Sequence, residues 1–174
     1  LRPCITNNIK LTYNIGNVMT SVAYNHSKYK IIELPFWKDN GIDNKNIEWL
    51  PVNFVKSSSI VATAIYSYSF GPIQGDISFY YSKPFMKATF LDEERTWNKP
   101  SYNVNLSAQC PISKASILAF DGSFDSAYSG MVTNHRSSWT LNLTYMQQLW
   151  KERLTLLVVA NDIFHTDRSN TWDM

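Results

Sequence analysis

The sequence has little charge and almost no cysteine. Charged residues make up 17% of its 174 residues, against about 25% in an ordinary soluble domain. Since the net charge is only +2, the chain has no broad basic surface for nucleic acid. Cys4 and Cys110, the only two cysteines, cannot build a disulfide framework, and no CxxC or Cys/His pattern indicates zinc. We therefore expect no nucleic-acid partner and no disulfide scaffold.

Long apolar runs and catalytic motifs are also missing. A transmembrane helix needs roughly 18 or more apolar residues, whereas the densest stretch is Leu154 to Ala160, so helical membrane spans are excluded. The sequence contains no GxSxG, GxGxxG or GxxxxGK[ST] pattern. His26, His135 and His165 are isolated and do not form an HExxH motif. We expect no enzyme activity, no catalytic residue, no cofactor and no metal site.

Uncharged polar and aromatic residues take the place of the missing charges. The chain has 19 serines, 16 asparagines and 12 threonines, and 25 of its residues are aromatic. This composition favours β-strands and is too hydrophobic for a disordered chain. The length suits one domain with its own core.

Alternation of apolar and polar residues predicts strands along the whole chain. From Tyr102 to Cys110, every second residue is apolar, and the residues between them are Asn, Ser or Gln. The segments from Trp139 to Tyr145 and from Leu154 to Ala160 alternate in a similar way. The sequence predicts eight strands, near residues 5–13, 18–33, 60–70, 75–90, 102–110, 118–128, 139–145 and 154–161.

The connections between these strands alternate in length. Because every second connection of an antiparallel meander lies at the same end, short turns share one end of the sheet and long links share the other. Bacterial outer-membrane barrels have short periplasmic turns and longer external loops. Several expected strands also approach the roughly ten residues that cross a bilayer at a tilt. We expect short turns at 14–17, 71–74, 112–114 and 149–152, and irregular links at 35–46, 91–101 and 131–137.

Two architectures fit this alternation. A soluble β-sandwich buries the apolar side of each strand against a second sheet, whereas a membrane barrel turns it toward lipid. Aromatic residues near strand ends, such as Tyr66, Phe70 and Trp139, favour the barrel because its interfacial girdles contain them. The sequence therefore predicts an all-β, antiparallel up-and-down meander of about eight strands, as a portion of a transmembrane β-barrel. A sandwich is the alternative.

The C-terminal part of the chain resembles a known family. Residues 137–170, SSWTLNLTYMQQLWKERLTLLVVANDIFHTDRSN, are similar to the end of the outer-membrane β-barrel proteins of Bacteroidetes that are related to TonB-dependent receptors. In that family, a strand of the type of Trp139–Tyr145 is followed by a short turn and by a strand that closes on a tetrapeptide like Asn161–Phe164. The preceding segments match the family in strand rhythm.

The resemblance implies a transport function for a longer parent protein. Residues 1–174 would be a single segment of a barrel of about 22 strands, cut at both ends, with the plug domain and last strand absent. The parent would take up a scarce solute, such as a metal chelate, vitamin or oligosaccharide, across the bacterial outer membrane. Its partners would be membrane lipid, an inner-membrane energy-coupling protein and a surface lipoprotein. The alternative function is a soluble all-β carbohydrate-binding or adhesion module.

Five residues are candidates for solute contact. Asp121 and Asp125 share the polar side of one strand, so in a barrel they would face the lumen and meet a cationic or hydroxyl-rich solute. Trp37, Trp49 and Trp97 lie in or near expected loops, where aromatic rings serve as platforms for a ligand such as a sugar.

The alternation also assigns each strand two environments. If the segment is isolated, its edge strands near 5–13 and 154–161 are open, so we expect it to close on itself as a small barrel or to self-associate. The lipid side is predicted to hold Tyr102, Val104, Leu106, Ala108, Leu118, Phe120, Phe124, Trp139, Leu141, Leu143, Leu154, Leu156 and Val158. The lumen side is predicted to hold Asn103, Asn105, Gln109, Asp121, Asp125, Asn142 and Thr144.

Overall fold

The computed structural model describes residues 2–39, 45–90, 93–130, 133–151, 153–166 and 171–173. Within these ranges the chain is all β, and no helix there is long and apolar enough to cross a membrane. The strands are β1 (Ile5–Ile15), β2 (Val18–Asp39), β3 (Lys45–Phe70), β4 (Ile73–Phe90), β5 (Glu93–Trp97), β6 (Ser101–Ser113), β7 (Ser116–Asp125), β8 (Tyr128–Ser129), β9 (Thr133–His135), β10 (Ser138–Leu149), β11 (Leu154–Ala160) and β12 (Thr171–Asp173).

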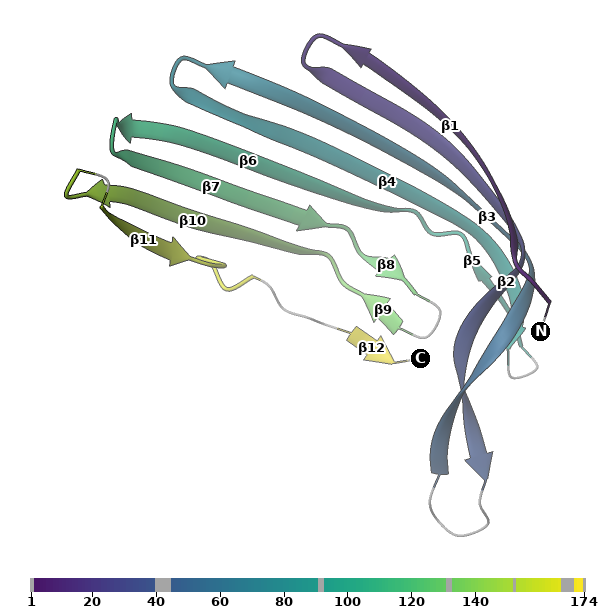
Figure 1. Ribbon diagram of the computed structural model, residues 1–174. Helices are drawn as coiled ribbons and strands as arrows, with labels where there is room; N and C mark the ends of the chain where they lie inside the picture. The colour runs from purple at the N-terminus through teal and green to yellow at the C-terminus, as the bar shows by residue number, and fades with distance from the viewer. Residues whose placement is uncertain are drawn as a thin grey trace.

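Eight of these strands form one antiparallel sheet in chain order. The order is β1-β2-β3-β4-β6-β7-β10-β11, with β5 paired to β4 beside this path. Strands β8, β9 and β12 form a small second sheet. Figure 1 shows the main strands side by side, each next to its neighbour in sequence. The predicted meander of about eight strands is confirmed.

Four tight turns join the main strands at one end of the sheet. Gly16 and Gly71 lie in the first two turns with φ angles of 52° and 57°, in the left-handed region that glycine adopts without steric cost. The third turn falls at residues 114–115. In the fourth, Trp150 and Lys151 take φ angles of 49° and 52°. All four turns lie at the same end of the strands (Figure 1), as their spacing predicted.

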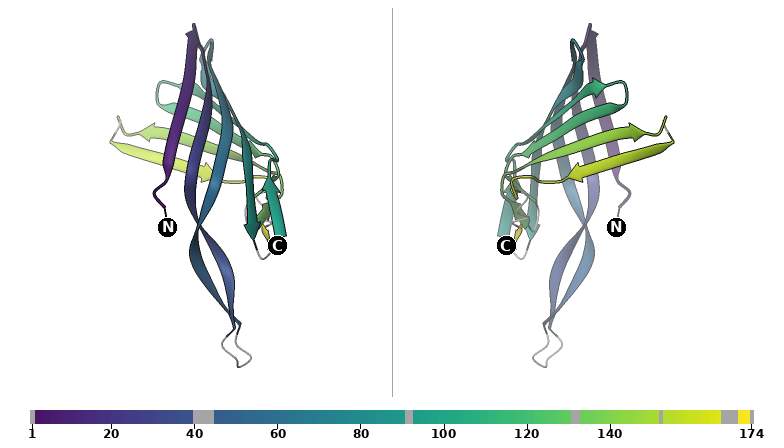
Figure 2. Two further views of the ribbon diagram at one scale, coloured as in Figure 1. Left: turned by 90° about the vertical axis from the view of Figure 1, so that its right-hand side faces the viewer. Right: turned by 90° about the vertical axis from the view of Figure 1, so that its left-hand side faces the viewer.

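The long connections at the other end are largely strand, so the expectation of irregular links is wrong. Strand β2 continues to Asp39 and β3 begins at Lys45, and the two form a ribbon that projects well beyond the sheet (Figures 1 and 2). The link at 91–101 contains β5, and the link at 131–137 contains β9. The backbone N–H and C=O groups of these links also need hydrogen-bond partners, and pairing between strands supplies them. We call residues 29–39 and 45–55 the arm.

No second layer covers the main sheet in the part of the chain that is described. Trp97 is the one large apolar side chain there that is buried, and all eleven residues of β1 are exposed. Figure 2 shows the sheet as a single curved wall. A sandwich would bury one apolar side of each strand against an opposing sheet, so the sandwich alternative is wrong for these residues.

The two outermost strands of the sheet, β1 and β11, each pair on one side only. Strand β1 pairs with β2 and β11 with β10, and the strand order does not bring β1 and β11 together. The eight strands therefore form an open wall and not the small closed barrel that was one of two expected outcomes. Unpaired strand edges are templates for further pairing.

The open edges lead to a prediction for the purified chain. In detergent we expect it to form dimers or larger species, because edge pairing satisfies the free backbone groups of β1 and β11. In a chain whose exposed Cys4 and whose Cys110 are replaced by serine, cysteines introduced in place of Leu11 and Val158 should become cross-linked between chains, whereas a cysteine at Ala62, in the middle of the sheet, should not. A monodisperse monomer with no cross-linking at either edge would contradict this prediction.

Candidate functional site

The register of the strands collects the apolar residues on one face of the sheet. Residues directly opposite each other in an antiparallel pair lie on the same face. Leu106 pairs with Ile77 on one side and Gly122 on the other, and Leu141 pairs with Gly122. The apolar face comprises Ile9, Leu11, Tyr13 and Ile15 of β1; Val22 and Tyr24 of β2; Ile60, Ala62, Ala64, Tyr66 and Phe70 of β3; Ile73, Ile77, Phe79 and Tyr81 of β4; Tyr102, Val104, Leu106 and Ala108 of β6; Leu118, Phe120 and Phe124 of β7; Trp139, Leu141, Leu143 and Tyr145 of β10; and Leu154, Leu156 and Val158 of β11.

Aromatic rings form a row across the apolar face near the ends of the strands that lie toward the arm. The ring of Tyr102 stacks on Phe79 and on Phe124, with centroids 6.4 and 5.7 Å apart. The ring centroids of Trp139 and Phe164 lie 5.5 Å apart. The row crosses β4, β6, β7 and β10, as an interfacial girdle of a membrane barrel does.

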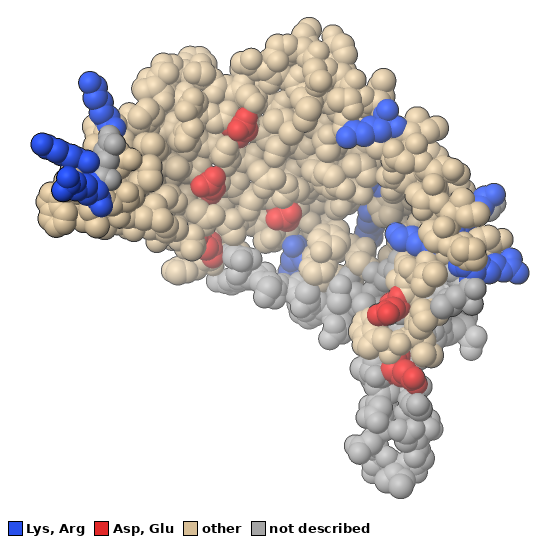
Figure 3. Space-filling model, viewed as in Figure 1, with Lys and Arg blue, Asp and Glu red and all other residues tan. Residues whose placement is uncertain are grey.

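The opposite face is mainly polar, although Ile65, Leu157 and Val159 also lie on it. It carries Ser, Thr, Asn, Gln and Asp side chains that bond across strands, including Ser123 to Thr140 at 2.8 Å and Asn103 to Asp125 at 2.8 Å. In Figure 3, acidic side chains lie over the sheet, while most basic ones gather toward its two ends. The predicted lumen residues Asn103, Asn105, Gln109, Asp121, Asp125, Asn142 and Thr144 all share this face by register.

One row of the polar face runs across five neighbouring strands. Asp76 of β4 pairs with Ser107 of β6, and Ser107 pairs with Asp121 of β7. Asn142 of β10 continues the row beside Asp121, and Ser67 of β3 continues it beside Asp76. We call these five residues the polar row.

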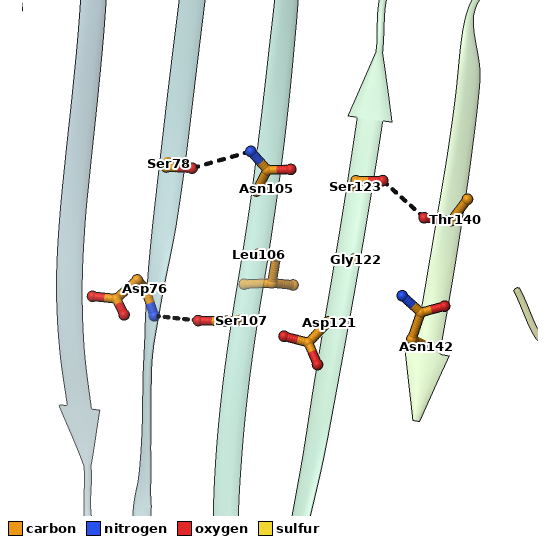
Figure 4. Close-up of a pocket in the computed structure, with 10 residues that line it drawn as sticks. All are labelled: Asp76, Ser78, Asn105, Leu106, Ser107, Asp121, Gly122, Ser123, Thr140 and Asn142. Carbon is orange, nitrogen blue, oxygen red and sulfur yellow. Dashed lines mark hydrogen bonds between the residues drawn. The ribbon is translucent and has the colours of Figure 1, made fainter. Parts of the chain in front are cut away.

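Hydrogen bonds and a shallow hollow shape the polar row. The Ser67 hydroxyl donates to the Asp76 carboxylate at 2.6 Å, and the Asp162 N–H donates to the Asn142 amide oxygen at 2.9 Å. The hollow has a volume of about 220 Å³ and is open to solvent. Asp76, Ser107, Asp121 and Asn142 line it from four strands; the Asp121 carboxylate turns toward β6, whereas the Asp76 carboxylate turns toward Ser67 of β3 (Figure 4). Two carboxylates at the lining of one hollow suit a cationic or hydroxyl-rich solute.

The sequence indicated part of this site and missed the rest. Asp121 was predicted because it alternates with aromatic residues along its own strand. Asp76 was missed, because only the register of β4 against β6 and β7 brings it level with Asp121. Asp125 lies on the same face but four residues farther along, bonded to Asn103.

The three candidate tryptophans lie in different surroundings. Trp97 is 6% exposed and its indole N–H donates to the carbonyl of Gly130 at 2.9 Å, so it anchors β5 and offers no free ring to a solute. Trp49 lies on the arm and is 55% exposed. The side chain of Trp37 lies outside the described residues. A ligand-contacting role stays a prediction for Trp37 and Trp49.

Comparison with known families shows to which protein family this open sheet belongs. The sequence matches the model of the Outer membrane protein beta-barrel family over residues 1–173. The chain belongs to this family. No curated protein and no solved structure matches it. The bacterial outer membrane is therefore its location, as predicted, and the family is typically not enzymatic. Among the described residues of this family member, no group of three His, Cys, Asp or Glu side chains could hold a metal ion.

Membership of the barrel family indicates what each face of the sheet is suited to contact. An outer-membrane barrel contacts lipid with an apolar outer band and encloses a polar interior. The sheet has one face of each kind, and its strands β6, β7 and β10 are 13, 10 and 12 residues long, enough to cross a bilayer. The apolar face is thus suited to lipid and the polar row to the barrel interior.

Proposed function

We propose that this chain forms part of the wall of a TonB-dependent receptor that imports a scarce solute, a metal chelate, vitamin or oligosaccharide, across the outer membrane of a member of the Bacteroidetes. The observation that carries the proposal is the polar row, which presents hydrogen-bonding and acidic side chains from five adjacent strands on one face of an open wall. A transport lumen needs such a lining over a wide arc.

The open arrangement of the sheet supports a wide barrel. A barrel of eight strands has an interior filled by its own side chains, whereas barrels of about 22 strands enclose a plugged lumen. Eight strands that do not close on themselves fit the wide type, with further strands of the parent protein beside β1 and β11. A plug domain would then lie against the polar face.

The similarity of residues 137–170 to TonB-dependent receptors supports the mode of transport. Strands β10 and β11 form the hairpin of that segment, with Leu143 opposite Ala160 and Leu149 opposite Leu154. Receptors of this kind receive energy from an inner-membrane coupling protein, and some work with a surface lipoprotein. We propose both as partners of the parent protein.

Uptake by intact cells tests the proposal. A strain without the gene should lose growth on one limiting solute in a panel of metal chelates, vitamins and oligosaccharides, and the gene should restore it. Removing the inner-membrane coupling protein should abolish the same uptake in cells that still carry the gene. Uptake that persists without the coupling protein would show a passive pore, and the proposal would be wrong.

The polar row gives a residue-level prediction for the same assay. In the full-length protein, Asp76→Asn with Asp121→Asn should lower the rate of solute uptake, by up to about fivefold for each carboxylate, because an exposed ion pair contributes up to about 1 kcal/mol. The matched control is Thr144→Asn, on the polar face of β10 but outside the hollow, which should leave uptake unchanged. Equal uptake by the double variant and the wild type, at equal amounts in the membrane, would contradict a role for the row.

A further inference from the structure

The hollow beside the polar row is lined by hydrogen-bonding groups and by no cationic side chain. Apart from the polar row, its lining includes four hydroxyl or amide side chains, those of Ser78, Asn105, Ser123 and Thr140. Over the described parts of β4, β6, β7 and β10, the polar face carries three aspartates, Asp76, Asp121 and Asp125, and no lysine, arginine or histidine. A negatively charged metal chelate would be repelled by this surface.

The amide group of Asn142 has a defined orientation in the hollow. Its Oδ1 accepts a hydrogen bond from the Asp162 N–H at 2.9 Å. A backbone N–H can only donate, so the atom that it meets is the amide oxygen, and the Nδ2 atom must face the other way. In Figure 4 this nitrogen turns toward β7. Asn142 therefore presents its two N–H donors on the side where Asp121 lies.

The segment that follows β11 holds Asn142 in this orientation. Asp162 has a φ angle of 44°, in the left-handed region that Asp and Asn adopt more readily than most residues. Its carboxylate accepts hydrogen bonds from the N–H and the hydroxyl of Thr166 at 3.0 and 3.1 Å. The Ile163 N–H donates to the Leu141 carbonyl at 3.0 Å. These bonds fix the segment against β10, so the Asp162 N–H stays beside Asn142.

Asp121 supplies hydrogen-bond acceptors next to these donors. It lies directly opposite Asn142, a position at which Cβ atoms are roughly 4.5–5.5 Å apart, and its carboxylate is exposed. An ionised carboxylate only accepts hydrogen bonds, and an amide nitrogen only donates them. A sugar hydroxyl can do both, so one hydroxyl can donate to Asp121 while its neighbour accepts from Asn142.

The size of the hollow and a nearby aromatic ring suit a chain of sugar units. The volume of about 220 Å³ is below the roughly 300–1,000 Å³ of sites for drug-sized ligands, so the hollow suits a single sugar unit. Tyr80 lies on the same face two residues beyond Ser78, roughly 7 Å along β4, and is 43% exposed. Its ring can stack on a further unit that extends out of the hollow.

We propose that the imported solute is an uncharged oligosaccharide, and that Asp121 and Asn142 bind neighbouring hydroxyl groups of one of its sugar units. The inference rests on the proposed function and selects one of its three solute classes. With an uncharged sugar, Asp121 makes a charge-assisted hydrogen bond and no ion pair, so the affinity should not depend on salt. A cationic solute would bind the same aspartates, but its affinity would fall as salt is added.

The test measures binding by the full-length protein, purified in a detergent without a sugar headgroup. An array of uncharged oligosaccharides is screened first, and isothermal titration calorimetry then gives the affinity of the oligosaccharide that binds best. Spermidine serves as a cationic probe and ferric citrate as an anionic chelate. Each titration is made at low and at high salt.

The test variant is Asn142→Asp. Its carboxylate can still accept the hydrogen bond from the Asp162 N–H, but it has no N–H to donate to a sugar. The matched control is Gln109→Glu, which makes the same change from amide to carboxylate on the polar face but outside the hollow. A third variant combines Asp121→Asn with Asn142→Asp, which exchanges the two groups and keeps the net charge of the wild type.

We expect the wild type to bind an oligosaccharide with an affinity that does not change with salt, and to bind ferric citrate weakly or not at all. Asn142→Asp should lower the affinity for the oligosaccharide by about fivefold, the contribution of about one hydrogen bond. Gln109→Glu should leave it unchanged. The exchanged variant again has one donor and one acceptor at the pair, so it should regain most of the affinity, which separates loss of the pair from loss of folding.

Four outcomes would overturn the proposal. They are no binding of any uncharged oligosaccharide by the wild type, binding of spermidine alone that weakens with salt, an unchanged affinity in Asn142→Asp, and equal losses in Asn142→Asp and Gln109→Glu. Binding by the purified protein requires no energy from the inner membrane. Its failure is therefore distinguishable from failure of the proposed function, which is tested by coupled uptake in cells.

Discussion

Leu141→Arg is expected to abolish assembly of the protein into the outer membrane, while Asn142→Arg, one residue away, is tolerated. Leu141 lies on the apolar face in the middle of β10, opposite Gly122. An arginine on the lipid face of a barrel costs roughly 2–4 kcal/mol near the bilayer centre. At Asn142 the new guanidinium would lie on the polar face opposite Asp121, where water and a carboxylate solvate it.

The amount of assembled protein is measured in membrane fractions by the heat-modifiable electrophoretic migration of the protein. Asn142→Arg removes the hydrogen bond from the Asp162 N–H, worth about 1 kcal/mol, so a small loss is expected there against a nearly complete one for Leu141→Arg. Single cysteines at 141 and 142 give an independent readout. Lipid-soluble thiol reagents should label 141 and water-soluble reagents should label 142, and equal labelling by both would show that the assignment of the faces is wrong.

Gly75→Ala is expected to disrupt pairing between β4 and β6, whereas Gly122→Ala leaves the sheet intact. A methyl group at Gly75 would collide with the backbone carbonyl oxygen of Ser107 and would come within 2.8 Å of the Tyr68 hydroxyl. The Tyr68 hydroxyl donates to the same Ser107 carbonyl at 2.9 Å, so the tyrosine closes over the glycine. Backbone atoms of a paired strand cannot move aside without breaking the ladder.

The loss of stability expected for Gly75→Ala is that of overpacking, about 1–3 kcal/mol or more in a well-packed position. At Gly122, the added methyl would meet the Leu141 side chain at 3.5 Å and the Thr140 carbonyl at 3.7 Å, both ordinary contacts, so a change within about 0.5 kcal/mol is expected. Urea titration of the folded protein in lipid vesicles compares the two variants. Equal destabilisation by both would contradict the close approach at Gly75.

Tyr68→Phe separates two roles of the tyrosine: its ring covers Gly75, and its hydroxyl donates a hydrogen bond to the Ser107 carbonyl. The phenylalanine ring would still cover Gly75, but the hydrogen bond to Ser107 would be lost, at a cost of about 1 kcal/mol. The order of stability should therefore be wild type, then Tyr68→Phe, then Gly75→Ala, when measured in the same vesicles.

Local features of the sequence determined the class of fold and the face of each residue. Side chains alternate across a strand with a period of two whatever the strand pairs with, so the lipid-side and lumen-side assignments from Tyr102 to Thr144 required no knowledge of neighbours. Glycine at positions 16 and 71 marks two of the tight turns for a similar reason, since the left-handed backbone there is a property of one residue. Alternation and turn spacing together predicted the meander.

The tertiary structure alone decided which residues meet across strands. Asp76 and Asp121 are 45 positions apart in the numbering, and they line one hollow only because Ser107 pairs with both. The Tyr68 hydroxyl reaches Ser107 over Gly75, and the buried Trp97 bonds to Gly130, through the same kind of long-range pairing. Strand register depends on hydrogen bonds between distant segments, and a shift of two residues would keep every side chain on its face while changing every partner. Alternation therefore determines the two faces, and the folded sheet determines the polar row and the contact of Tyr68 with Gly75.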